Sequence, residues 1–98
     1  ILIKLHCDLI WNKELKQLYL NDKLLTPTQK EFLLIELLLR IPEKIFVNEE
    51  IISYIWKEEF NENPDISNLK NLISRLRSKI PALKIDNIYG FGYKIVTI

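Results

Sequence analysis

The sequence predicts one α+β domain, with short strands first, three helices in the middle and a β-hairpin at the end. The chain has 98 residues, of which 48% are hydrophobic and 28% charged, and this length suits one modest core but not two. The apolar residues alternate up to about residue 25 and then change to a helical period. The two glycines of the chain, Gly90 and Gly92, share one short segment near the C-terminus, as is typical of a hairpin turn.

The composition excludes several other classes of protein. The hydrophobic content, with only 2 glycines and 4 prolines, argues against a disordered or collagen-like chain. The apolar run 32–41 is interrupted by Glu36 and Arg40, so we expect no membrane span, and no secretion signal opens the chain. A single cysteine, Cys7, and a single histidine, His6, cannot form an internal disulfide or a closed zinc site. We therefore expect no metal, no cofactor and a cytoplasmic location.

Residues 2–25 are predicted to form a small antiparallel meander. Short runs of alternating apolar residues are separated there by the polar pairs Asn12-Lys13 and Asn21-Asp22, which is the pattern of strands joined by tight turns.

A first helix is predicted to begin at Thr26. Thr26 would be the N-cap and Pro27 the first helical residue, and Gln29, three residues after the cap, would complete a capping box. Pro42 would end the helix. The segment is apolar on more than one side, which predicts a central helix. Its solvent side is predicted to carry the charged residues Lys30, Glu31, Glu36 and Arg40.

A second helix is predicted to start with Asn48 as its N-cap, followed by Glu49 and Glu50 near the positive end of the helix dipole. Its buried side would hold Ile51, Ile52, Ile55 and Trp56. The segment 57–64 then loses its periodicity and becomes acidic, which predicts a loop.

The third predicted helix runs from about 68 to 80, with either Asp65 or Ser67 as its cap. At 100° per residue its apolar side chains fall on one narrow stripe, made of Leu69, Leu72, Ile73, Leu76 and Ile80. The opposite face is small, polar and basic, without a carboxylate, and consists of Asn71, Ser74, Arg75 and Ser78. After Pro81 we expect strands at 83–88 and 93–98, with a turn at 89–92 in which both glycines supply backbone freedom.

Charge is distributed unevenly along the chain although the net charge is only +1. Residues 43–65 carry two basic and seven acidic side chains, a net charge of −5, whereas residues 66–98 carry six basic side chains and one acidic, a net charge of +5. A basic C-terminal third is what a surface for a polyanion would need. Ordinary solvated faces would give the same numbers, so charge alone leaves both interpretations open.

The order of these elements is that of a winged helix-turn-helix, in which the third helix enters a major groove of DNA and the hairpin contacts the adjacent backbone or minor groove. The residue types on the third helix suit this use. Arginine can pair with guanine and asparagine with adenine, each through two hydrogen bonds, and serine is small enough for close approach.

Four motifs then carry a family resemblance. They are LTPTQKEFLL at 25–34, VNEEII at 47–52 with Trp56 after it, ISRLRSKI at 73–80 and YGFGYK at 89–94. Together they resemble the OmpR/PhoB-type winged-helix domain, the C-terminal effector of bacterial two-component response regulators. The resemblance covers essentially the whole chain, as one domain over residues 1–98. Because the sequence contains no methionine, we expect it to be a fragment, with a receiver domain upstream.

The resemblance implies the DNA-contacting residues. Arg75 matches the arginine that reads bases, Asn71 lies on the same face and Asn68 lies at the helix start. Two groups are expected at the DNA: the recognition-helix residues Asn68, Asn71, Ser74, Arg75, Ser78 and Lys79, and the backbone and wing residues Trp56, Asn87, Tyr89, Gly90, Tyr93 and Lys94.

Other side chains of these motifs are interpreted differently. Trp56 would bury its ring and use only its N–H, Arg77 is expected to be structural, and Lys79 lies on the flank of the helix, where phosphate contact and solvation are both open.

The chain departs from the family pattern in its wing. Tyr89 stands where many relatives carry an arginine that reaches the minor groove, and Ser67 and Ser74 occupy positions that are often basic. Fewer cations predict weaker binding with a shallower salt dependence.

The same resemblance implies partners. They are double-stranded DNA bound as a dimer, the receiver domain with its sensor kinase, and RNA polymerase through the acidic loop residues Glu58, Glu59 and Glu62. The isolated domain would be monomeric. The alternative is a winged-helix module that binds an acidic protein instead of DNA, because a fold does not settle a function. Nothing in the sequence assembles a nucleophile, a base and an orienting group, so we do not expect an enzyme.

Overall fold

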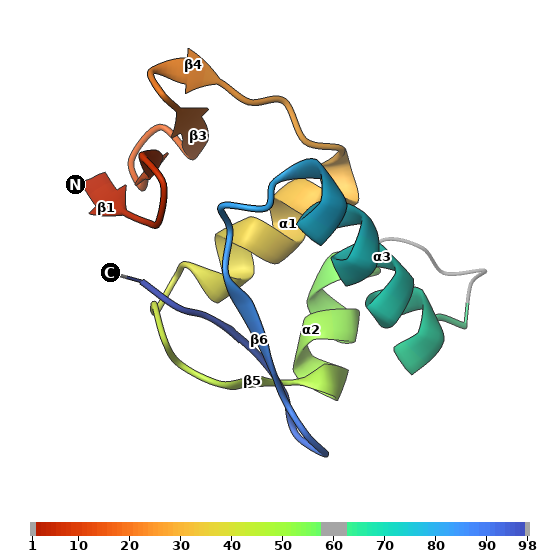
Figure 1. Ribbon diagram of the computed structural model, residues 1–98. Coiled ribbons are helices and arrows are strands. Elements are labelled where there is room, and N and C mark those ends of the chain that lie inside the picture. The colour runs from red at the N-terminus through yellow and green to blue at the C-terminus, as the bar shows by residue number, and fades with distance from the viewer. Residues whose placement is uncertain (1, 58–62, 98) are drawn as a thin grey trace.

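The computed structural model describes residues 2–57 and 63–97, and it contains three helices and two antiparallel sheets (Figure 1). The elements in chain order are β1 (Leu2–Lys4), β2 (Leu9–Asn12), β3 (Gln17–Leu20), β4 (Lys23–Leu24), α1 (Gln29–Leu38), β5 (Phe46–Val47), α2 (Asn48–Ile55), α3 (Ile66–Lys79), β6 (Ile85–Ile88) and β7 (Gly92–Ile95). This is the predicted α+β winged helix-turn-helix.

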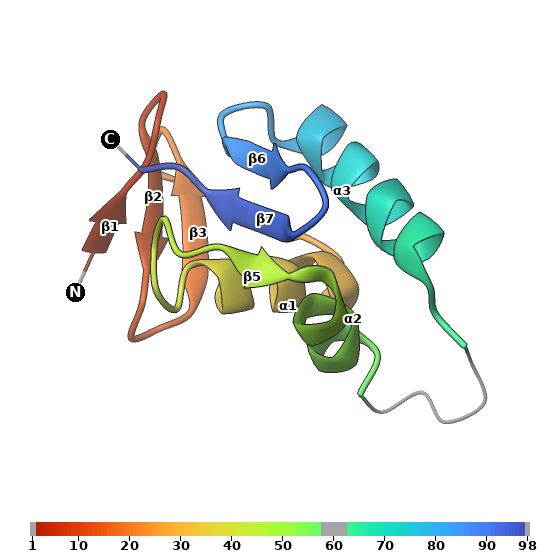
Figure 2. The same ribbon diagram turned by 90° about the horizontal axis from the view of Figure 1, so that it is seen from below.

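The N-terminal sheet confirms the predicted meander, because its strands are hydrogen-bonded in the order β1-β2-β3-β4. The turn between β3 and β4 is the predicted Asn21-Asp22 pair, with φ of 50° and 66°. A two-residue hairpin turn of this kind needs positive φ at both central residues, and asparagine and aspartate tolerate it better than most residues. The sheet and α3 lie on opposite sides of α1 in both views (Figure 2).

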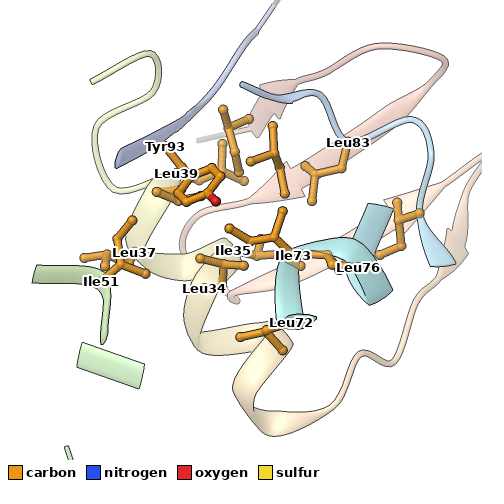
Figure 3. Packing of buried hydrophobic residues seen from close by; sticks show 14 of the residues in the cluster. Leu34, Ile35, Leu37, Leu39, Ile51, Leu72, Ile73, Leu76, Leu83 and Tyr93 are labelled. Carbon is orange, nitrogen blue, oxygen red and sulfur yellow. The ribbon is translucent and has the colours of Figure 1, made fainter. Parts of the chain in front are cut away.

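The core is built around α1. Leu34, Ile35 and Leu38 of this helix are completely buried, and α1 contacts both α2 and α3. Figure 3 shows Ile73 and Leu76 of α3 pointing toward the same cluster. The central role predicted for the first helix is therefore correct.

The start of α1 differs from the prediction by two residues. Thr28 is the N-cap: its side chain accepts a hydrogen bond from the Glu31 backbone N–H, and the Glu31 side chain accepts one from the Thr28 backbone N–H. Pro27 therefore lies outside the helix, where its ring favours an extended Thr26. Glu31 is buried rather than on the solvent side. The helix also ends at Leu38, with Leu39 as its C-cap, before Pro42 is reached.

The caps of the other two helices are also resolved. The N-cap of α2 is Val47, which makes no side-chain capping bond, so Asn48 is the first helical residue and not the cap. The N-cap of α3 is Asp65, whose carboxylate accepts hydrogen bonds from the backbone N–H groups of Ser67 and Asn68. Asp65, and not Ser67, is thus the cap among the two candidates.

The C-terminal sheet contains one strand more than predicted. β5 pairs with β7, which pairs with β6, so β7 is the central strand of a three-stranded sheet. This pairing explains Gly92, because a Cβ there would lie 1.9 Å from the backbone oxygen of Phe46 in β5. Gly90 is needed for its φ of 79°. Only Gly90 therefore supplies turn freedom, and Gly92 permits a close approach of two strands.

Candidate nucleic-acid interface

The outward face of α3 is the main candidate site. Its apolar stripe is buried as predicted, with Leu69 and Leu76 completely inaccessible to solvent. Opposite this stripe, Asn71, Ser74, Arg75 and Ser78 are all exposed. All charged residues within α3 are cations, so the face presents donors and positive charge without a carboxylate of its own.

Asn68 has a structural task at the start of this helix. Its side-chain oxygen accepts a hydrogen bond from the Asp65 backbone N–H at 2.9 Å, which completes a capping box. The residue is exposed, but its oxygen is committed to the cap, so a base contact from Asn68 is left to its NH2 group.

Arg75 lies alongside its own helix. Its Nε donates to the backbone oxygen of Asn71 at 3.4 Å, one turn earlier on the same face. The residue is exposed, and the guanidinium has five N–H donors. Four of them remain after this bond, which is enough for two parallel hydrogen bonds to a guanine edge.

Lys79, at the C-terminal end of α3, is paired with a carboxylate from another element. Its Nζ lies 2.8 Å from Oε1 of Glu31. Glu31 is only 3% exposed. Burial acts to raise the pKa of this carboxyl, but the hydrogen bonds from Lys79 and Thr28 outweigh burial and hold the pKa below its ordinary value. A groove beside the pair is lined by Thr28, Glu31, Ser74, Arg75, Ser78 and Lys79.

Arg77 is structural, as predicted. Its Nη2 donates to the backbone oxygen of Ile85 at 2.6 Å. Because Ile85 is the first residue of β6, this bond connects α3 with the hairpin. The Arg77 side chain thus stabilises the domain and is not part of the outward face of α3.

The tip of the wing is aromatic. Tyr89 is 94% exposed and Phe91 is 63% exposed, on either side of Gly90. The backbone of the tip is held, since the Phe91 N–H donates to Ile88 at 2.9 Å and the Phe91 oxygen accepts from the Asn48 N–H at 3.0 Å. Phe91 was absent from the predicted site, although its position between the two glycines was the available signal.

Of the other residues predicted to contact the DNA backbone, some are buried and others are exposed. Tyr93 is 3% exposed and its ring packs in the core (Figure 3), which corrects its interpretation as a surface contact of the wing. Trp56 is also buried, as expected for its ring. Asn87 is exposed, and Lys94 is half-buried opposite Asp86 on the neighbouring strand. Asp86 therefore reduces the positive potential at Lys94.

A second ionic cluster lies at the other end of α1. Glu36 accepts a hydrogen bond from Tyr54 of α2 at 2.7 Å and pairs with Lys16 at 2.7 Å. Burial acts to raise the pKa of Glu36, but the bonds from Lys16 and Tyr54 prevail and lower it. Burial and the bond to Glu36 raise the pKa of Tyr54. This cluster joins α1, α2 and the N-terminal sheet.

Some predictions lie outside these observations. Glu58, Glu59 and Glu62 fall in 58–62, outside the described residues. Within 2–57 and 63–97, no group of three or more metal-ligating side chains could hold an ion. No helix in these same ranges has the length and hydropathy to cross a membrane.

Comparison with known proteins decides the family. The model of the family described as "Transcriptional regulatory protein, C terminal" matches residues 22–95. The chain belongs to this family, the OmpR/PhoB type of winged-helix, DNA-binding domain. The family is one of transcriptional regulators and is not a known enzyme class.

Two curated relatives illustrate the match. The heme response regulator HssR of Staphylococcus aureus (strain JH9) is 32% identical over 90 residues, which are 90% of this chain and 40% of HssR. The transcriptional regulatory protein CssR of Bacillus subtilis (strain 168) is 31% identical over 77 residues, 79% of this chain and 33% of CssR. The chain thus spans about a third to two fifths of the length of these relatives.

The solved structures show the same fold. The DNA-binding domain of Bacillus subtilis CssR superimposes with a TM-score of 0.72 at 27% identity, covering 90% of this chain and 99% of that domain. The DNA-binding domain of the response regulator AdeR, crystallised with an intercistronic region, gives a TM-score of 0.74 at 20% identity and covers 97% of this chain and 99% of that one.

Proposed function

We propose that this domain binds double-stranded DNA sequence-specifically as the output domain of a two-component response regulator. The observation that carries the proposal is the exposed face of α3, where Asn71, Ser74, Arg75 and Ser78 lie opposite a fully buried stripe. A helix held rigidly on one side, with base-reading side chains on the other, fits a major groove. AdeR, which shares the fold, was crystallised with an intercistronic region.

Each part of the interface has a role in this proposal. Arg75 reads a guanine edge, Asn71 reads adenine, and Ser74 and Ser78 let the helix approach. Asn68 contributes through its NH2 group at the helix start. The indole N–H of Trp56 and the side chains of Asn87 and Lys94 contact the sugar-phosphate backbone of the DNA. The wing at 89–93 lies on the adjacent DNA backbone or minor groove through Tyr89 and Gly90.

The longer relatives support further partners. Because HssR and CssR are two to three times the length of this chain, we propose that it is one domain of a larger regulator with a receiver upstream, phosphorylated through a sensor kinase. The receivers would bring two copies together on DNA, while the isolated domain stays monomeric. We further propose that Glu58, Glu59 and Glu62 contact RNA polymerase, and that the protein acts in the cytoplasm, where bacterial DNA is.

The test is fluorescence anisotropy of a labelled duplex, enriched from random sequences by repeated selection on this domain, across a salt series. We expect binding that weakens as salt rises, and about a tenfold loss for Arg75→Ala, within the range of one good base contact. Lys23→Ala is the matched control, since it removes one exposed cation from β4, away from α3.

Two results would contradict the proposal. A folded domain that binds no duplex at micromolar concentration favours the alternative of a protein-interaction module. Equal losses for Arg75→Ala and Lys23→Ala would show that α3 has no special place in binding.

A further inference from the structure

Glu31 is unusual among the described residues, because it is the one charged side chain in the buried core. It lies in the first turn of α1 and shares the groove with Ser74, Arg75 and Ser78 of α3. A carboxylate directly behind a DNA-reading helix should repel phosphate and is costly to bury. Its position therefore requires a compensating partner.

That partner is Lys79. Oε1 of Glu31 accepts from the Thr28 backbone N–H at 2.9 Å and from Lys79 Nζ at 2.8 Å. One oxygen thus joins the N-cap of α1 to the last residue of α3, across 48 positions of sequence. The side chain of Lys79 is 47% exposed, so the ion pair lies at the edge of the groove and not in the interior.

The ends of α3 are therefore held differently. At its N-terminus, Asp65 and Asn68 cap the helix locally. At its C-terminus, the described side-chain bonds run to other elements: Lys79 bonds to α1, and Arg77 bonds to Ile85 of β6. The Lys79 bond resists a sliding or tilting of α3 relative to α1, which would move Arg75 relative to any bound base edge.

We infer that Glu31 is a positioning residue for DNA recognition and that Lys79 is withheld from the phosphates. The pair fixes the tilt of α3 and neutralises one cation of its surface, so it favours sequence readout over nonspecific attraction. The inference rests on the proposed function. It removes Lys79 from the group of DNA contacts predicted from the sequence.

Counterion release makes the inference measurable. Each phosphate neutralised by a protein cation adds about 0.9 to the slope of log affinity against log salt. A withheld Lys79 adds nothing, whereas a Lys79 freed from Glu31 adds one phosphate contact. Removing the Glu31 carboxylate should therefore steepen the slope, whereas removing the Lys79 cation should leave the slope unchanged, although the two side chains form a single bond.

The experiment uses two duplexes, one of mixed sequence and one enriched from random duplexes by repeated selection on this domain. Affinities are measured across a salt series for the wild type, Arg75→Gln, Lys79→Gln, Glu31→Gln and the double variant. Urea unfolding establishes that each variant is folded in the assay. Arg75→Gln is the matched comparison, because it removes a cation from the same groove.

We expect Arg75→Gln, which loses a base contact and no phosphate contact, to lower the affinity ratio of selected to mixed duplex and to change the slope little. Lys79→Gln should leave the slope unchanged while it lowers the affinity ratio of selected to mixed duplex severalfold. Glu31→Gln should steepen the slope by about 0.9 and lower the same ratio. The double variant should return to the wild-type slope.

A flattening of the slope by about 0.9 in Lys79→Gln, the effect of one lost phosphate contact, overturns the inference alone, because DNA binding itself would then be established. An unchanged ratio in Lys79→Gln overturns the positioning role. This variant suffices if Glu31→Gln does not fold, since Lys79 is half-exposed. A wild-type domain that binds neither duplex overturns the proposed function and this inference with it.

Discussion

Helix α3 and the wing, which is the hairpin of β6 and β7, are built on different chemistry. The described charges of α3 are all positive, and its outward side chains are hydrogen-bonding groups. The wing tip presents Tyr89 and Phe91, while the positive charge of Lys94 faces Asp86 across the hairpin. On the proposed function, α3 supplies base reading and salt-dependent attraction, and the wing supplies contacts that salt affects little.

The two regions are also attached differently. The wing is held by backbone pairing, with β5 on one side of β7 and β6 on the other. The helix is held by its apolar stripe and by the side chains of Arg77 and Lys79. Variants that act on only one type of attachment can therefore separate the two regions.

The largest effect is expected from Gly92→Ala. The new Cβ would lie 1.9 Å from the Phe46 oxygen, so β5 and β7 must separate, at a cost of about 3 kcal/mol of unfolding free energy. Gly90→Ala is the control, because nothing lies within 4 Å of its Cβ and only the positive φ is penalised, by about 1 kcal/mol. Urea unfolding measures both, and equal losses would contradict the strand-contact explanation.

Acid is expected to have a smaller effect. Protonation of the Glu31 and Glu36 carboxylates should together lower the unfolding free energy by about 2 kcal/mol. The folded-state pKa values of Glu31 and Glu36 are lowered, so their stabilisation is present above the unfolded pKa of about 4.3 and disappears as pH falls through the folded values. Because backbone pairing does not titrate, amides of α3 should lose hydrogen-exchange protection before those of β7. Glu31→Gln should remove part of this difference, and simultaneous loss in both elements would contradict it.

The smallest effect is expected at the wing tip. Tyr89→Ala should weaken DNA binding about fivefold, about 1 kcal/mol for the lost apolar contact with the duplex, with an unchanged salt slope. Tyr89→Arg should restore the affinity and steepen the slope by about 0.9. Anisotropy across a salt series measures both. A flatter slope in Tyr89→Ala would show that the wing acts through charge after all.

The sequence predicted those parts of the fold that local patterns determine. The stripe on α3 follows from helical spacing alone, and Leu69 and Leu76 are indeed fully buried. The Asn21-Asp22 turn follows from the backbone preferences of two adjacent residues. Such features need no knowledge of what else touches them.

The parts that were missed depend on contacts between distant residues. Thr26 with Gln29 and Thr28 with Glu31 both have the spacing of a capping box, and the structure forms the second, which was not predicted. The contact of Glu31 with Lys79, 48 positions later, could not be read from either spacing. The same contact gave Lys79 a partner that its position on the helix could not reveal. Tyr93 follows a glycine in the hairpin and was expected at the DNA backbone, but it lies opposite Phe46 on β5 and is only 3% exposed. β5 itself has only two residues, too few for a periodic signal.

The bond from Arg77 to the Ile85 oxygen has a consequence for the kind of duplex that fits. It connects the end of α3 to the first residue of β6, so the angle between helix and hairpin is set before any ligand arrives. A domain in which the angle between helix and hairpin is preset suits B-form DNA, whose wide major groove admits a helix. The same domain should bind RNA duplexes poorly, because their major groove is deep and narrow. Discrimination between the two nucleic acids would then follow from the rigidity of the protein, without any contact to a 2′-hydroxyl.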